Sequence, residues 1–310
     1  MPININIVRR ALNDDEIVPC FQPIVELHSG QLTGFEILAR WKHSKAGLVL
    51  PENFIFLAEK HGLVSQLMRE VLQKAFLATS ALPEVLGLSV NASSIQLQDL
   101  KLPQEIRDAA DGTGFPLERL TVEITESAFV DNLERAQTIA RELKTMGCRL
   151  SLDDFGTGSS SLRHLPVMPF DELKIDRSFV ASMTHNLPSR KIVAAIVGLG
   201  RSLGLIALAE GVETNEQAEI LLRLGCERGQ GWLYGHPLPA EELRRVIDDA
   251  PHKFSMIVMK CDASAFSSMD AQRRQRRTQW QSIYDSPSEG TALPMRVPDT
   301  GPSAIAVPRR

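Results

Sequence analysis

The chain lacks the cysteine and histidine patterns of a disulfide scaffold or a zinc site. Its four cysteines are spread over 310 residues, and no two of them form a Cys-x-x-Cys pair. Its seven histidines show no His-x-x-x-His or other zinc-binding spacing. We therefore expect no zinc, and we interpret the cysteines as reduced packing residues of a cytoplasmic protein.

Long apolar runs and an export signal are missing as well. The most apolar segment, residues 192–209, contains three glycines and is interrupted by Arg201 and Ser202, so it is too polar for a membrane span. The first ten residues contain no apolar stretch followed by a cleavage site. With 43% hydrophobic residues, the chain is expected to be soluble and to bury a sizeable core.

Positive charge is outnumbered by negative charge in most of the chain. The formal net charge of the whole chain is −4. Residues 251–310 contain nine Lys or Arg against five Asp or Glu, a sum of +4, so residues 1–250 carry −8. An acidic body is unsuited to following the phosphates of DNA or RNA, so we expect no nucleic-acid polymer as a partner. A phosphorylated small substrate would need cations to mediate its binding.

The composition changes after residue 250. Residues 286–310 contain five prolines and few large apolar residues, which is typical of disorder. We predict one domain over 1–250 and a basic, Pro-rich tail or linker over 251–310. The arginines of this tail are interpreted as a solvated helix face: Arg273, Arg274, Arg276 and Arg277.

Residues 1–250 alternate between helix and strand patterns. Two strand-like runs, 18–25 and 32–41, are separated by a gap too short for a parallel crossover, which predicts an antiparallel hairpin. An amphipathic helix, one glycine and an apolar strand then recur three times, at Gly147, Gly204 and Gly225. About eight strands in this order match a (β/α)8 TIM-type barrel. A doubly wound open sheet is the alternative, but it lacks an early Gly-x-Gly-x-x-Gly turn.

One strand ends in two adjacent carboxylates. An alternating apolar run is followed by Asp153 and Asp154, and then by a loop with Gly156 and Gly158. The glycines permit a turn that brings both carboxylates into one small space. Their mutual repulsion is relieved by a shared proton or a bound cation. Taken alone, the stretch is explained equally well by an Asp-Asp helix cap and a glycine turn.

Further polar residues lie at predicted strand ends or, for the first of them, within the hairpin. They are Glu36, Asn91, Glu123, Lys174, Glu210 and Gln230. Singly, each is explained as a solvated charge, a cap or a turn. Several carboxylates at one rim, however, are costly to bury unless they are paired or bind metal. Carboxylates and an Asn carbonyl suit Mg²⁺ or Mn²⁺, and two such ions about 4 Å apart assist phosphoester displacement. The lysine would hold the attacking water or neutralise charge in the transition state.

Ordered motifs across about residues 5–248 resemble the EAL-domain cyclic di-GMP phosphodiesterases. The matching stretches are Phe21-Gln22-Pro23-Ile24-Val25, Glu36-Ile37-Leu38-Ala39-Arg40-Trp41, Ser89-Val90-Asn91, Glu123-Ile124-Thr125-Glu126, Asp153 to Gly158, Leu173-Lys174-Ile175-Asp176, Ala209-Glu210-Gly211-Val212-Glu213 and Gln230-Gly231. The resemblance implies a barrel with an antiparallel first strand, in agreement with the hairpin. It also implies a homodimer and hydrolysis of cyclic di-GMP to linear 5′-pGpG.

The resemblance further implies roles for individual residues. One ion would be held by Glu36, Asn91, Glu123 and Asp153. The second would be held by Asp153, Asp154 and Glu210, which together with Lys174 form the expected catalytic group. Substrate contact or support is expected from Gln22, Leu38, Arg40, Asp176, Glu213 and Gln230, and Glu126 would brace the 153–158 loop.

Two positions depart from the family pattern. Ile37 stands where the family usually has Ala, and strand alternation predicts that it points away from Glu36 into the strand-helix layer. Its extra carbon atoms would overpack that layer at a cost of ~1–3 kcal/mol. Ser159 stands where the family usually has Tyr, which would loosen the loop that carries Asp154.

An enzyme that lowers a bacterial second messenger is therefore the expected function. The competing interpretation is a receptor of the same fold that binds cyclic di-GMP without cutting it. Such receptors usually lose metal ligands or the lysine, and both are present here. A weaker alternative is another metal-dependent barrel enzyme that acts on a phosphorylated metabolite. Regulation is expected from a sensor domain or partner outside this chain.

Overall fold

The fold is described by a computed structural model. It describes residues 3–80, 82–83, 85–125, 128, 132–156 and 165–253. The predictions for Glu126, for Ser159 and for most of the tail concern residues outside these ranges.

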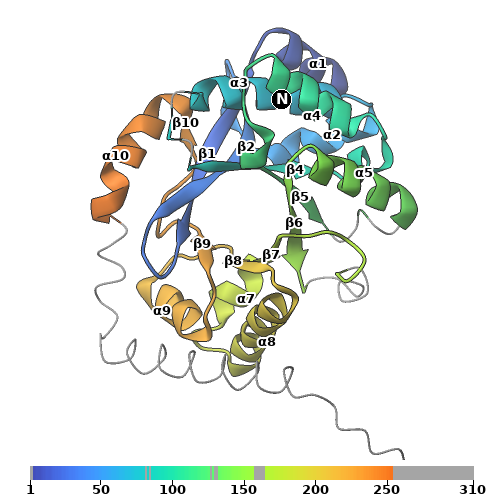
Figure 1. Cartoon of the computed structure of the whole chain (residues 1–310). Helices are drawn as coiled ribbons and strands as arrows, with labels where there is room; N and C mark the ends of the chain where they lie inside the picture. Colours follow the sequence, from blue (N-terminus) through green and yellow to red (C-terminus); the bar gives the residue numbers. More distant parts are fainter. Residues whose placement is uncertain are drawn as a thin grey trace, which may run out of the picture. The chain divides into compact units, whose positions relative to one another are not determined.

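The described strands form one sheet that closes into a barrel (Figure 1). The strands of the closed ring are β1 (Ile17–Glu26), β2 (Leu32–His43), β4 (Gly87–Ala92), β5 (Leu120–Thr125), β6 (Arg149–Phe155), β7 (Glu172–Ile175), β8 (Ile206–Ala209) and β9 (Arg228–Gln230). Two short strands, β3 (Gly47–Val49) and β10 (Leu238–Pro239), extend the sheet at its edges.

The first strand runs against both of its neighbours. β1 pairs antiparallel with β2, with Gln22 opposite Glu36, and antiparallel with β9. The other neighbouring pairs of the ring, from β2–β4 to β8–β9, are parallel. The predicted (β/α)8 barrel with an antiparallel first strand is therefore confirmed, and the open doubly wound sheet is excluded.

Helices surround the ring of strands (Figure 1). They are α1 (Ile5–Asn13), α2 (Ile55–Lys60), α3 (Val64–Thr79), α4 (Leu102–Asp111), α5 (Leu133–Thr145), α7 (Arg177–Ser182), α8 (Leu187–Leu203), α9 (Asn215–Leu224) and α10 (Leu243–Lys253). Short 3-10 turns are η1 (Pro51–Asn53), η2 (Gln96–Gln98), η3 (Leu117–Arg119) and η5 (Ala240–Glu242).

The start and end of α9 follow the local sequence. Thr214 Oγ1 accepts a hydrogen bond from the backbone of Gln217 at 3.2 Å, and the Gln217 side chain accepts one from the backbone of Thr214 at 3.0 Å. These reciprocal bonds form a capping box, which the Thr-x-x-Gln spacing of the sequence predicts. Gly225 ends the helix in the left-handed conformation with φ +82°, which glycine adopts without steric cost.

Pro51 and Gly62 are typical start and stop signals of a helix, so the sequence predicts one helix from Pro51 to about Lys60, and this prediction is wrong. The chain forms η1 first, departs from helical geometry at Phe54 with φ −138°, and then begins α2. Phe54 is fully buried and packs edge-on against Trp41, with ring centroids 6.0 Å apart. Burial of this ring therefore overrides the helix signal of the local sequence.

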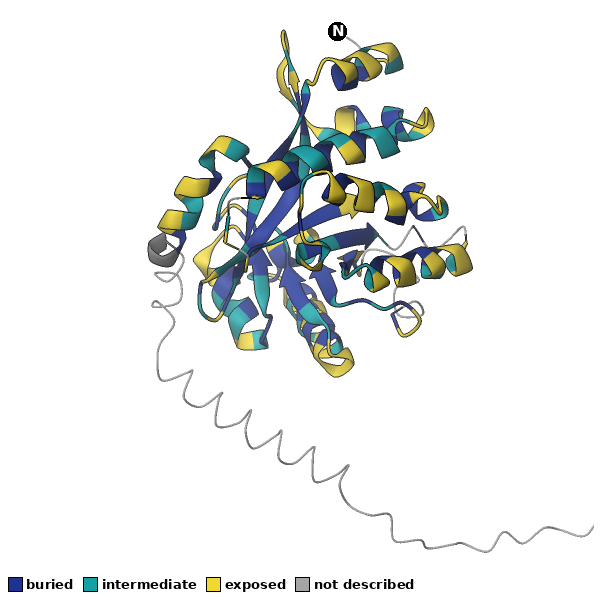
Figure 2. Cartoon of the chain, turned by 45° about the horizontal axis from the view of Figure 1, so that its top comes forward, coloured by how far each residue is buried: buried dark blue, intermediate teal, exposed yellow. Residues whose placement is uncertain are grey.

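The apolar core lies outside the barrel ring, between the strands and the helices. Along β6 and β7, Leu152 and Leu173 are fully buried and belong to this core. Alternate residues, such as Ser151 and Asp153, point to the barrel interior and are also buried. Figure 2 shows the strands as the buried centre of the fold and the helices exposed on their outer sides. Because barrels of this type usually fill their interior with branched apolar residues, a polar interior indicates a functional site.

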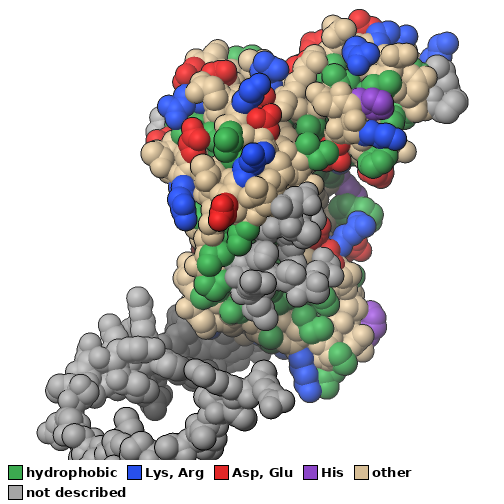
Figure 3. All heavy atoms as spheres, turned by 90° about the vertical axis from the view of Figure 1, so that its right-hand side faces the viewer, with side chains coloured by type: hydrophobic (Ala, Val, Ile, Leu, Met, Phe, Trp, Pro, Cys, Tyr) green, Lys and Arg blue, Asp and Glu red, His purple; other side chains and the backbone are tan. Residues whose placement is uncertain are grey.

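The described surface has mixed charge. On the face seen in Figure 3, Lys and Arg side chains alternate with Asp and Glu side chains. No helix in the described part of the chain is long and apolar enough to cross a membrane.

Candidate active site

The adjacent carboxylates of Asp153 and Asp154 share one space because β6 bulges at its end. The pairing of β6 with β7 shifts register there, and Asp154 adopts a left-handed backbone with φ +55°. Asp tolerates this conformation better than most residues. The backbone N–H of Asp154 donates to Oδ1 of Asp153 at 2.9 Å. The reversal was expected at Gly156 and Gly158. Gly156 is left-handed too, with φ +99°, and Gly158 lies outside the described residues.

Lys174 lies at the centre of the cluster and is fully buried. Its Nζ is 2.6 Å from Oε2 of Glu123, 2.6 Å from Oε1 of Glu210 and 3.3 Å from Oδ1 of Asp153. Oε1 of Glu36 lies 4.0 Å away. A single ammonium thus faces four carboxylates, and the pocket has an excess of potential negative charge.

A chain of side-chain amides fixes the opposite side of the rim. Nδ2 of Asn91 donates to Oε1 of Glu36 at 2.8 Å, and Nε2 of Gln230 donates to Oε2 of the same carboxylate. Nε2 of Gln230 also donates to Oε1 of Gln22 at 3.1 Å. Nε2 of Gln22 donates in turn to the Gly235 carbonyl at 3.2 Å. These bonds connect β1, β2, β4 and β9.

Burial and crowding shift the ionisation of the cluster. Burial raises the pKa of Glu210 to about 8, against the opposing effect of Lys174, and Asp153 adds repulsion. Burial also raises the pKa of Glu123 well above its usual range, and burial and Asp153 together raise the pKa of Asp154. Burial alone would lower the pKa of Lys174, but the surrounding carboxylates raise it well above its usual value. Lys174 is therefore charged, and it offsets only part of the acidic charge.

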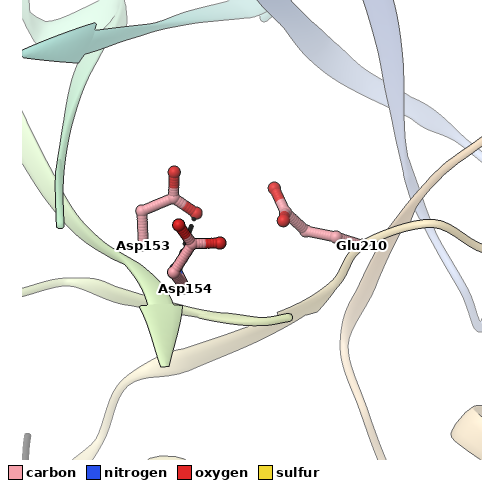
Figure 4. Close-up of side chains that lie close together, drawn as sticks. All are labelled: Asp153, Asp154 and Glu210. Carbon is pink, nitrogen blue, oxygen red and sulfur yellow. Dashed lines mark hydrogen bonds between the residues drawn. The ribbon is translucent and has the colours of Figure 1, made fainter. Parts of the chain in front are cut away.

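The donor set fits divalent cations. Carboxylate oxygens of Asp153, Asp154 and Glu210 all lie within 4.8 Å of one another. Figure 4 shows the two aspartates at the end of β6 facing Glu210 across the mouth of the barrel. In addition, buried Oε1 of Glu123 has no hydrogen-bond partner among the described residues. Closely spaced oxygen ligands without His or Cys are the kind that Mg²⁺ and Mn²⁺ bind.

The remaining candidate residues lie around this cluster. Leu38 is half-buried and lines an adjacent cavity of about 380 Å³. Arg40 is buried, and its Nη1 donates to the preceding carbonyl at 2.9 Å. Asp176 hydrogen-bonds with Asp154 and adds to the rise of its pKa. Glu213 is exposed on the loop before α9.

Two local features that stabilise the rim, a helix cap and a close contact between two loops, were not predicted. The backbone N–H of Ser178 donates to Oδ1 of Asp176 at 3.0 Å, so Asp176 also caps α7; the Asp-x-Ser spacing is a signal that would have found this cap. A Cβ on Gly231 would lie 2.3 Å from the backbone of Val212. Glycine therefore lets the two loops meet, and Val212 N donates to the Gln230 carbonyl at 2.9 Å.

Ile37 points away from the acidic cluster, as strand alternation predicts. It is 3% exposed and belongs to the core between strands and helices. The cavity of about 380 Å³ also borders Ile37, together with Leu67 and Met68 of α3. The expected overpacking of this layer stays a prediction.

The fold and the site define a (β/α)8 barrel protein with a carboxylate cluster suited to divalent cations at the carboxyl ends of its strands. The sequence-family model of the EAL domain matches residues 5–237 of the chain. The chain therefore belongs to the EAL domain family.

Curated relatives match the same part of the chain. The bifunctional diguanylate cyclase/cyclic di-GMP phosphodiesterase MucR of Pseudomonas aeruginosa is 40% identical over 240 residues, 76% of this chain and 35% of the relative. The cyclic di-GMP phosphodiesterase NbdA of the same organism is 37% identical over 244 residues, 77% of this chain and 31% of the relative. The chain thus spans about a third of the length of these relatives.

A solved structure matches over nearly its whole length. The PaMucR phosphodiesterase in complex with c-di-GMP is 40% identical with a TM-score of 0.74, and the match covers 77% of this chain and 98% of that one. The EAL enzyme Bd1971, bound to cAMP and cyclic di-GMP, is 29% identical with a TM-score of 0.74 and coverages of 78% and 68%.

Proposed function

We propose that this chain hydrolyses cyclic di-GMP to linear 5′-pGpG with the help of two divalent cations, Mg²⁺ or Mn²⁺. The observation that carries the proposal is the buried group of carboxylates around Lys174, at the barrel end where enzymes of this architecture bind substrate. The names of the EAL relatives support the choice of substrate.

The ligand sets follow from the side chains at the mouth. One ion would be held by Glu36, Asn91, Glu123 and Asp153, and the other by Asp153, Asp154 and Glu210. The ions would supply positive charge against the phosphate and lower the pKa of an attacking water. Because Lys174 contacts both sets of carboxylates, cation binding would leave its ammonium free to act on the substrate.

The side chains of the protein would then bind the substrate, orient it and stabilise the transition state. Leu38 would pack against a guanine base and Arg40 would donate to a phosphate. Lys174 would hold the attacking water and stabilise negative charge on the phosphoryl oxygens. Attack on phosphorus breaks the bond to the 3′ oxygen, and the proton from the water ends on that oxygen. Gln22, Gln230, Asp176 and Glu213 would support the substrate and the rim, and Glu126 would brace the loop after β6.

The test is a turnover assay with chromatographic separation of nucleotides. EDTA-treated protein is incubated with cyclic di-GMP alone and with Mg²⁺, Mn²⁺ or Ca²⁺. We expect one product that co-elutes with 5′-pGpG, formed with Mg²⁺ or Mn²⁺ and absent in EDTA. Saturable binding without loss of substrate would instead identify a receptor. Failure of cyclic di-GMP to shift the melting temperature would indicate a different phosphorylated substrate.

The wider setting is proposed on the same basis. We propose a homodimer that acts in the cytoplasm and is regulated by a sensor domain or partner outside the matched region. The support is that the match covers only about a third of the length of each of these relatives. Light scattering coupled to size-exclusion chromatography measures the oligomeric state, and a monomer at micromolar concentration would contradict the dimer.

A further inference from the structure

The barrel interior contains a second polar layer beneath the mouth. Each of its residues precedes a mouth residue by two positions on the same strand, and therefore shares its inward face. The pairs are Ser89 and Asn91 on β4, Thr121 and Glu123 on β5, Ser151 and Asp153 on β6, Glu172 and Lys174 on β7, and Arg228 and Gln230 on β9. We call the cavity at this amino-terminal end of the strands the floor cavity; its volume is about 260 Å³.

Two glycines of the neighbouring strands β2 and β4 line the wall of the floor cavity. A Cβ on Gly34 would lie 2.4 Å from the carbonyl oxygen of Gly87, and both residues line the cavity. Neither position contributes a side chain, so this end of the barrel lacks part of the side-chain layer that usually fills it. The space is left to a ligand or to water.

Two arginines contribute to the cavity lining. Arg149 is exposed at its edge and forms no ion pair within the described residues. Nη1 of Arg228 donates to Oε2 of Glu172 at 2.8 Å, and its other N–H groups donate no hydrogen bond within the described ranges. Oε1 of Glu172 already accepts from Ser151 Oγ at 3.2 Å. Two guanidinium groups against one occupied carboxylate give the lining a net positive charge.

A buried hydroxyl points independently to a missing partner. Ser89 lines the floor cavity, is only 3% exposed, and its Oγ has no hydrogen-bond partner in the described part of the chain. Buried polar atoms are nearly always hydrogen-bonded, because an unsatisfied one costs free energy. A group that accepts from this hydroxyl and from the arginines would satisfy the site.

We propose that the floor cavity binds a small oxyanion, either inorganic phosphate or a compact metabolite that carries a phosphate or carboxylate group. Arg149 and Arg228 present planar N–H forks that match such groups, and Ser89 adds a buried donor. The volume is below the ~300–1,000 Å³ of sites for drug-sized ligands, so the ligand is small. This site does not depend on the proposed phosphodiesterase activity, because its residues lie outside the mouth.

The test is isothermal titration calorimetry on the full chain in EDTA. Phosphate and malonate are titrated separately, with sodium chloride at matched ionic strength as the reference. We expect saturable binding of at least one oxyanion with a dissociation constant of roughly 0.1–5 mM. Tighter binding of phosphate assigns the site to phosphate-bearing ligands, and tighter binding of malonate assigns it to carboxylates.

Variants of the cavity residues, compared with a control variant elsewhere, show whether the anion binds in the floor cavity. Arg149→Gln should weaken binding at least about tenfold through loss of a charge-assisted hydrogen bond, and Ser89→Ala should weaken it severalfold. Arg141→Gln, on the exposed face of α5, should bind like the wild type. Heats equal to those of chloride would overturn the proposal. Equal affinities of the wild type and Arg149→Gln, or competition by cyclic di-GMP, would also overturn it by placing the anion elsewhere. Arg149 is exposed, so melting temperatures are expected to confirm that its variant folds.

Discussion

The two ends of the barrel interior use the same strands and carry opposite charge. At the mouth, Lys174 faces Glu36, Glu123, Asp153 and Glu210. In the floor cavity beneath it, Arg149 and Arg228 outnumber Glu172. At the floor, Arg228 and Glu172 neutralise each other and Arg149 adds a positive charge, whereas the mouth keeps an uncompensated acidic excess. The contrast indicates that the mouth is suited to bind cations. Its acidic excess lowers the stability of the fold, as is common at functional sites.

The largest expected effect is loss of activity on removing the carboxylate that both ligand sets share. Asp153→Asn should reduce cyclic di-GMP turnover by roughly a thousandfold, because one change weakens both cation sites. The exposed Asp248, which pairs with Arg244 at 3.4 Å, provides the matched Asp248→Asn control with unchanged turnover. Turnover of Asp153→Asn within about tenfold of the wild type would contradict the shared-ligand scheme.

The second prediction concerns the loss of the positively charged Lys174 inside the mouth. Lys174→Met should lower the melting temperature of the metal-free protein by roughly 10 °C, because breaking a buried ion pair leaves carboxylates without a partner. Mn²⁺ should raise the melting temperature of this variant more than that of the wild type, since the ion replaces the lost positive charge. Differential scanning fluorimetry in EDTA and in Mn²⁺ measures both. The exposed Lys191→Met is the control, and an identical loss in that variant would sink the argument.

At the floor, the pair of Arg228 and Glu172 should behave as a neutralised unit. Their side chains are 22% and 6% exposed. Arg228→Gln should lower the free energy of unfolding by about 2 kcal/mol, because it leaves the glutamate buried and unpaired. Adding Glu172→Gln should restore more than half of that loss. Urea unfolding of the two single variants and the double variant measures the coupling; additive losses would show that the two residues act independently.

Much of the fold was predictable from local patterns. The short gap between the first two strands led to the antiparallel hairpin, and the Thr214 capping box and Gly225 marked both ends of α9. These signals involve residues close in the chain, so they do not depend on tertiary contacts. The break at Phe54 was not predictable, because it depends on packing against Trp41 in a different element.

The candidate site was predictable as a set of residues and not as a set of contacts. Carboxylates at successive strand ends must meet at one rim once the sheet closes. The pairing of Lys174 with Glu123 and Glu210 depends on side-chain directions that the sequence does not contain. Arg228 and Glu172 are 56 positions apart, and no local motif joins them. The floor cavity therefore became visible only in three dimensions.

The smallest expected effect is a change in how the stability of the protein depends on pH, caused by Glu210 at the mouth. In the metal-free protein the pKa of Glu210 is raised from 4.5 to about 8. Between these values the folded state holds a proton that the unfolded state has released, so stability falls as pH rises through this window. The raised pKa of Lys174 lies above it and adds no slope there. Glu210→Gln keeps a neutral side chain and should flatten the decline.

The measurement is the melting temperature in EDTA at pH 5.5 and 8.5. We expect the wild type and Glu210→Gln to agree within about 2 °C at the lower pH, and the variant to melt several degrees higher at the upper one. Glu142→Gln, exposed on α5, should follow the wild type at both values. Added Mn²⁺ should remove the difference by stabilising the ionised carboxylate of the wild type. Parallel curves for Glu210→Gln and the wild type would mean that the acidic excess at the mouth is relieved in the folded state without a proton on Glu210.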